Sequence, residues 1–182
     1  EKLLAETDMV AFTNWTMLAN LNGIIEYFSE LMGAQDHKPL VFLDLADPKK
    51  RTTADIRKVL ELIARIPCPT TLSMNQSESA IIAQVLGVKE EDMLKRAVKI
   101  KEKTGIHCIV IHPLEGAAVA HPKEAVWVDG PYTSKPKLTT GAGDNFNAGF
   151  CSAWLGGLLP GECLAAGVSS SGYYVRNAQS AS

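Results

Sequence analysis

Apolar runs of strand length alternate with segments of helical periodicity along this chain of 182 residues. The run PLVFLDL at 39–45 contains a single aspartate among apolar residues, as is typical of a parallel strand that is covered on both faces. The ranges that predict strands are 9–14, 39–45, 69–74, 106–112, 116–120 and 125–128. Strands that alternate with helices predict a three-layer α/β/α fold, in which helices cover both faces of a mostly parallel, Rossmann-like sheet.

Helices are predicted where apolar residues recur at spacings of three and four. The range 17–33 places five such residues on one face, namely Leu18, Leu21, Ile25, Phe28 and Met32. Thr53 is expected to cap the next helix, which ends before Pro67. The remaining predicted helices cover 78–87, 90–103, 144–157 and 161–175.

Composition excludes several classes of protein. The net charge of −2 and the lack of a basic stripe argue against a nucleic-acid partner, and the basic residues of 49–57 are interpreted as a solvated helix start. No apolar run approaches the roughly 20 residues of a membrane helix, so no membrane partner is expected. The four cysteines form no CxxC pair, which indicates reduced thiols and a cytoplasmic protein. No repeat or linker divides residues 1–182, which we interpret as one α/β domain.

The predicted topology also locates a site. Right-handed crossovers place the loops that leave the strands at one edge of the sheet, where open α/β sheets bind their ligands. Polar and glycine residues gather in these loops, which cover 13–16, 44–48, 73–78, 112–116 and 138–144. We expect the site at the carboxyl ends of the strands.

The stretch LTTGAGDNFNAGF at 138–150 places two glycines and an aspartate before a helix. The first turn of a helix has unpaired amides that attract anions, and glycine allows a phosphate to approach them closely. Asp144 has two interpretations, since it could cap the helix or face a substrate. The stretch lacks the Gly-Lys-Ser/Thr ending of a P-loop, and Phe146 stands where a dinucleotide fingerprint needs its third glycine.

This stretch resembles the second signature of the ribokinase-like (PfkB) carbohydrate kinases. The residues that match are Thr139, Gly141, Ala142, Gly143, Asp144, Phe146, Ala148 and Gly149. Asn75 and Glu78, at the end of a predicted strand, resemble the Asn-x-x-Glu motif of that family. Most of the chain is therefore similar to the C-terminal, nucleotide-binding part of such a kinase.

The resemblance implies ATP-dependent phosphorylation of a hydroxyl group on a sugar or sugar-like small molecule. It implies that Asp144 is the general base and that the anion hole consists of Gly141, Ala142 and Gly143. Asn75 and Glu78 would organise Mg²⁺ and the phosphates, although Glu78 read alone is a helix N-terminal charge. The other residues implied to bind the nucleotide are His112, Gly116, Thr139 and Asn177.

Two positions depart from the family pattern. Leu138 stands where many members have a residue that helps to ligate a monovalent cation, which argues against activation by potassium. His112 stands where the family usually has a threonine near the phosphates, and it either replaces that threonine or has a structural role. These departures keep a second hypothesis open, a nucleotide-binding module without catalysis.

Members of the family are much longer than this chain. The resemblance implies that the N-terminal half, with the acceptor-binding residues and the lid, is missing from residues 1–182, so that this chain alone should have little kinase activity. A sheet edge left exposed in this way would favour a homo-oligomer. Asn14, Trp15 and Thr16 either border the acceptor site or, in the case of Trp15, fill the core. The acceptor itself stays open, because nucleoside and pyrimidine-alcohol kinases share this half.

Overall fold

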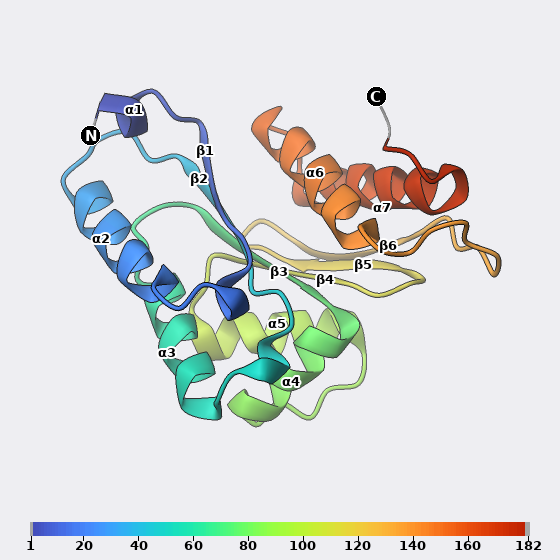
Figure 1. The fold of residues 1–182 in the computed structure, drawn as a ribbon, viewed down its shortest axis with the longest axis horizontal. Helices are drawn as coiled ribbons and strands as arrows, with labels where there is room; N and C mark the ends of the chain where they lie inside the picture. Colours follow the sequence, from blue (N-terminus) through green and yellow to red (C-terminus); the bar gives the residue numbers. More distant parts are fainter. Residues whose placement is uncertain (1, 181–182) are drawn as a thin grey trace.

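The computed structural model describes residues 2–180, and a six-stranded sheet forms its middle layer (Figure 1). The strands follow one another across the sheet in chain order: β1 (Met9–Phe12), β2 (Leu40–Asp44), β3 (Thr70–Asn75), β4 (Cys108–His112), β5 (Gly116–Ala120) and β6 (Ala125–Asp129). The pairs from β1 to β4 are parallel, whereas β4–β5 and β5–β6 are antiparallel. The predicted mostly parallel sheet is therefore confirmed.

Helices cover both faces of the sheet, which confirms the three-layer fold (Figure 1). One face carries α2 (Leu21–Gly33), α3 (Thr53–Ala64), α4 (Gln76–Leu86) and α5 (Met93–Thr104). Since the parallel strands are adjacent in chain order, right-handed crossovers bring all these helices to the same side. The other face carries α6 (Ala142–Leu155) and α7 (Pro160–Asn177). Three short helices complete the described chain: α1 (Lys2–Ala5), η1 (Trp15–Met17) and η2 (Pro48–Lys50).

The hydrophobic core consists of two clusters, one on each face of the sheet. The larger cluster lies under α2–α5 and includes the fully buried Ile25, Ile82 and Ile109. The smaller cluster lies under α6 and α7, where the ring of Phe150 is centred 6.4 Å from that of Phe42 in β2. This contact packs the middle of α6 against the middle of β2.

Three predictions about local structure are wrong. The helix predicted over 17–33 begins only at Leu21, because η1 and a turn at the half-exposed Leu18 precede it. Thr52, not Thr53, caps α3, since Thr52 has the extended backbone of a cap and its hydroxyl accepts the amide of Asp55 at 3.1 Å. The loop at 112–116 joins two antiparallel strands and does not lead to a helix.

No helix in the described range 2–180 has the length and apolar character needed to span a membrane.

The packing of α6 on α7 yields a first testable prediction. A Cβ at Gly149 would lie 2.7 Å from the carbonyl oxygen of Ala166 and 2.8 Å from the Cβ of Ser170, so Gly149→Ala must push α7 away. We expect the free energy of unfolding to fall by about 1–3 kcal/mol, as for other overpacked cores. Gly23→Ala is the matched control, because nothing lies within 4 Å of its added Cβ and helix propensity favours alanine by ~1 kcal/mol. Equal urea midpoints for the two variants would contradict the prediction.

Candidate active site

The turn before α6 is held in place by α7. Gly141 is the N-cap of α6 and has φ 91°, a left-handed conformation that favours glycine. The hydroxyl of Tyr174 in α7 donates to the carbonyl of Thr140 at 2.7 Å, and a Cβ at Gly141 would lie 2.9 Å from that hydroxyl. Backbone conformation and close packing therefore both require glycine at position 141.

The first turn of α6 has free amides. The amide of Ala142 donates to the carbonyl of Thr139 at 3.1 Å. Within residues 2–180, the amides of Gly143 and Asp144 have no such acceptor, as is usual in a first helical turn. Of the three amides that the resemblance assigns to the anion hole, that of Ala142 is therefore occupied, whereas those of Gly141 and Gly143 have no acceptor among residues 2–180. The free amides of Gly143 and Asp144 can hold an anion at the positive end of the helix dipole.

Asp144 is exposed at the third position of α6. Its carboxylate accepts no hydrogen bond from the described residues, and the cap position belongs to Gly141, so the capping interpretation is wrong. A carboxylate that is free and exposed in this way can accept a proton from a bound molecule.

A buried network that the sequence analysis missed joins α6 to the central strands. The side-chain amide of Asn147 donates to the Asp44 carboxylate at 2.8 Å, and the hydroxyl of Ser73 donates to the side-chain oxygen of Asn147 at 2.9 Å. Asn147 follows Asp144 by three residues, so both lie on one face of α6. The clue in the sequence was Asp44, the one polar residue that ends the apolar run of β2.

The charge of Asp44 depends on its surroundings. Burial raises the pKa of its carboxyl group, against the lowering effect of the hydrogen bonds from the Ala46 amide and from Asn147. The negative charge of Asp144 raises this pKa further, which places the two carboxylates close enough to interact.

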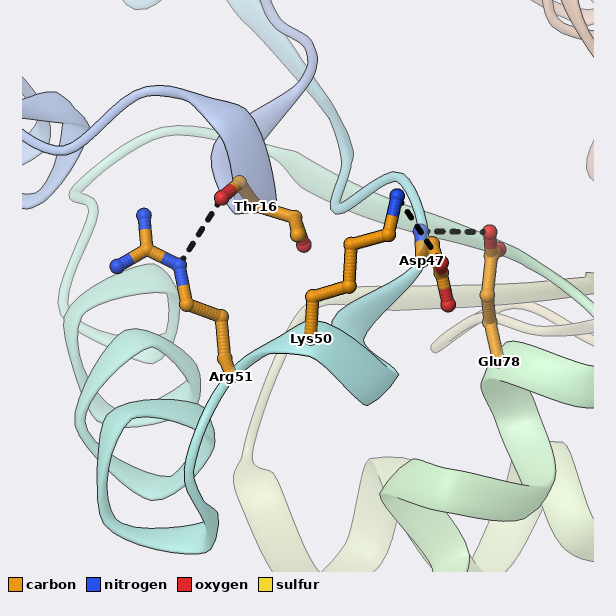
Figure 2. Close-up of polar contacts among 5 residues, drawn as sticks. All are labelled: Thr16, Asp47, Lys50, Arg51 and Glu78. Atoms are coloured by element: carbon orange, nitrogen blue, oxygen red, sulfur yellow. Dashed lines mark hydrogen bonds and ion pairs between the residues drawn. The ribbon is translucent and has the colours of Figure 1, made fainter.

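Asn75 and Glu78 form a capping box at the start of α4. The Asn75 side chain accepts the amide of Glu78 at 2.9 Å, and the Glu78 carboxylate accepts the amide of Asn75 at 2.9 Å. The same carboxylate accepts the amide of Asp47 at 3.2 Å, as Figure 2 shows. Burial raises the pKa of Glu78, and the charges of Asp44 and Asp47 act in the same direction, against these two hydrogen bonds. Glu78 is therefore a helix N-terminal charge, as its position in the sequence indicates. The same carboxylate can also bind a ligand.

Six of the predicted site residues line one cleft of about 400 Å³, namely Asn75, His112, Gly116, Thr139, Ala142 and Gly143. Residues of α7 and of the loop 130–136 complete its wall, so the cleft lies over the β4–β6 side of the sheet. Glu78, Gly141 and Asp144 are not among its lining residues. Asn177 lies outside the cleft as well, where its side chain donates to the carbonyl of Tyr173 within α7 at 2.9 Å.

His112 forms part of the cleft wall and also packs against α6. Its ring stacks on Phe146, with the ring centroids 4.5 Å apart and an interplanar angle of 24°. Burial lowers the pKa of His112 to about 4, so the imidazole is neutral at physiological pH. His112 therefore has the structural role foreseen as an alternative, and it presents a neutral hydrogen-bonding group to the cleft.

Comparisons with known proteins show which family this chain resembles. A family model described as prokaryotic ketohexokinase matches residues 2–182. A ketohexokinase from Haloferax volcanii is 25% identical over 179 residues, which are 96% of this chain and 48% of that protein. A ribokinase structure from Thermotoga maritima is 19% identical, with a TM-score of 0.70 over 98% of this chain and 54% of that one. An adenosine kinase structure from Trypanosoma brucei brucei is 16% identical, with a TM-score of 0.78 over 97% of this chain and 54% of that one.

These matches confirm the resemblance to the ribokinase-like (PfkB) kinases. The chain spans about half the length of each of these relatives.

The depressed pKa of the half-buried His112 gives a prediction about pH. Because the pKa of His112 is about 4 in the folded state and roughly 6.5 in an unfolded chain, the unfolded state binds the extra proton between these values. The stability linked to His112 is thus complete above pH 6.5 and is lost as the pH falls toward 4. We expect His112→Gln to flatten this decline, as measured by urea unfolding between pH 7 and pH 4.5. The exposed His37→Gln is the control, and an unchanged slope in the His112 variant would contradict the prediction.

Proposed function

Because the chain belongs to the prokaryotic ketohexokinase family, we propose that the full-length protein transfers a phosphoryl group from ATP to a hydroxyl group of a ketohexose or a closely related sugar. One observation carries this proposal: the exposed carboxylate of Asp144 lies beside the free amides of the first turn of α6. A proton acceptor and an anion site in one helical turn are the two elements that phosphoryl transfer to an alcohol requires.

The base and the amides act on different groups in the same step. Asp144 accepts the proton of the sugar hydroxyl, while the oxygen of that hydroxyl forms a bond to the γ-phosphorus and the bond from the γ-phosphorus to the ADP oxygen breaks. The amides of Gly143 and Asp144 donate to the oxygens of the moving phosphoryl group, where negative charge is spread in the transition state. These donors belong to a helix held by Tyr174 and Asn147, so they need little reorganisation during the reaction.

The cleft over the β4–β6 side is the proposed nucleotide site. Thr139 and Gly116 line it together with the neutral His112, which adds no positive charge. In-line transfer places the attacking and leaving oxygens on opposite sides of the phosphorus. The sugar therefore approaches from the other side of Asp144, where β1 and β2 end.

Mg²⁺ fits the donor set at the end of β3. Residues 2–180 contain no group of three or more acidic, histidine or cysteine side chains able to enclose a metal ion. Mg²⁺ commonly binds one or two carboxylates and completes its shell with phosphates and water. Glu78 and Asn75 offer such oxygens, and a cation would offset the burial and the neighbouring charges of Asp44 and Asp47 that raise the pKa of Glu78. When bound there, Mg²⁺ neutralises charge on the phosphate oxygens.

The acceptor can be tested directly. Release of ADP by the full-length protein is measured with ketohexoses, aldopentoses and adenosine at equal concentrations. We expect the highest kcat/KM with a ketohexose, whereas a preference for adenosine would favour a nucleoside kinase. Binding of ATP by calorimetry without turnover of any acceptor would favour the non-catalytic module.

Asp144→Asn tests the proposed base. The variant keeps the size of the side chain but cannot accept the proton, so we expect kcat to fall by about 10²–10⁴-fold. ATP affinity should stay within about threefold, because Asp144 does not line the cleft. Asp36→Asn is the control, since Asp36 is exposed and precedes β2, at the opposite end of that strand from Asp44. Near-normal turnover by the Asp144 variant would rule out its role as the base.

Glu78→Gln separates the cap from the proposed metal ligand. Glutamine can still complete a capping box, so we expect the free energy of unfolding to change by less than about 1 kcal/mol. A neutral amide is a weaker ligand for Mg²⁺, and the Mg²⁺ concentration needed for half-maximal rate should rise about tenfold. An unchanged Mg²⁺ requirement at unchanged stability would leave Glu78 with its capping role alone.

A further inference from the structure

The side chain of Arg51 joins the loop after β2 to the loop after β1. Its Nε donates to the carbonyl of Thr16 at 3.1 Å, a contact that Figure 2 shows. Its Nη2 donates to the carbonyls of Trp15 at 3.1 Å and Leu18 at 3.4 Å. One guanidinium therefore satisfies three carbonyl groups of the η1 turn, using donors that lie in one rigid plane.

Further contacts hold the same turn. The guanidinium carbon of Arg51 lies 5.0 Å from the centre of the Trp15 ring, within the range of a cation–π interaction. The Trp15 indole donates to the side chain of Asn22 at 2.7 Å, and the amide of Thr16 donates to the carbonyl of Leu45 at 3.0 Å. The η1 turn is thus bound to the end of β2, with Arg51 as its main side-chain contact.

The conformation of the loop that carries Arg51 is fixed by its own contacts. Ala46 and Asp47 have φ angles of 51° and 54°, an unfavourable left-handed conformation for residues other than glycine. The amide of Asp47 donates to Glu78 at 3.2 Å, and the ammonium group of Lys50 lies 3.4 Å from the Asp47 carboxylate (Figure 2). This loop therefore connects the first turn of α4, where Glu78 lies, to the η1 turn that follows β1.

The position of the η1 turn relates it to the chemistry. The nucleotide cleft lies over the β4–β6 side, whereas Asn147, one turn after Asp144 in α6, donates to Asp44 at the end of β2. In-line transfer then requires the acceptor on the β1–β2 side of Asp144, the side on which η1 stands. The hydroxyl of Thr16, in that turn, is buried and has no partner among residues 2–180, which leaves a polar group there to be satisfied.

We propose that Arg51 is a positioning residue for the acceptor, because it fixes the η1 turn that borders the sugar hydroxyl approaching Asp144. This inference rests on the proposed kinase function for its link to the sugar. The contact of Arg51 with the η1 turn is independent of that function, because it follows from the three hydrogen bonds. Arg51 acts through the turn and does not itself touch the reacting atoms.

The experiment compares Arg51→Ala, Arg51→Lys and Lys49→Ala in the full-length enzyme. Lys49 is the matched control, an exposed cation two residues away that makes none of these contacts. We expect Arg51→Ala to raise the KM for the acceptor by about tenfold or more, while kcat and the KM for ATP change by less than about threefold. Arg51→Lys should keep most of the defect, because the single nitrogen of an ammonium group cannot replace the two coplanar nitrogens, Nε and Nη2, that donate to this turn. Lys49→Ala should match the parent.

Hydrogen exchange tests the contact of Arg51 with the η1 turn separately from its effect on the acceptor. In Arg51→Ala, the amides of residues 13–19 should exchange faster than in the parent, while those of β3 and β4 stay protected. An active parent whose acceptor KM is insensitive to Arg51→Ala would overturn the positioning role. A parent that phosphorylates no acceptor would refute the proposed function, and unchanged exchange at 13–19 would refute the hold of Arg51 on the turn.

Discussion

The geometry of the site depends on the hydrogen bonds of one buried side chain, Asn147. Its oxygen accepts the hydroxyl of Ser73 and its amide donates to Asp44, so it fastens the start of α6 to the ends of two parallel strands. Both polar ends of the amide are satisfied, which makes its burial inexpensive. These hydrogen bonds of Asn147 also position the exposed Asp144, one turn earlier in α6, and the free amides beside it.

Several residues of the site also serve the fold. Asn75 and Glu78 close the N-terminal end of α4, and His112 packs its ring against Phe146 while it lines the cleft. Because each of these residues has a structural contact, the sequence pattern around Glu78 and His112 is compatible with a structural role and with a functional one. A capping carboxylate already lies at a strand end and is already partly desolvated, so a ligand that binds it encounters a group that is rigidly oriented.

Sequence periodicity predicted the strands and their mostly parallel arrangement, because these follow from short-range patterns and from the handedness of crossovers. The edge expected to hold the site is the edge where Asn75 and His112 line the cleft. The predicted start of α2 was wrong because Leu18 continues the helical spacing in the sequence. In the structure its side chain is half exposed and its carbonyl accepts a hydrogen bond from Arg51. Thr52 and Thr53 are both suitable caps, and only the backbone conformation decides between them. Asn147 and Arg51 were missed because their partners lie far away in the chain, and Arg51 resembled an ordinary solvated charge.

The network of Asp44, Ser73 and Asn147 has a consequence for the divergence of related proteins. Loss of the Asn147 amide would leave the Asp44 carboxyl group partly buried with only the amide of Ala46 to stabilise its charge. A lineage that exchanges Asn147 for an aliphatic residue thus has to neutralise position 44 as well, and the hydroxyl at position 73 then loses its acceptor. The three positions should covary across an alignment, although they belong to three separate segments of the chain.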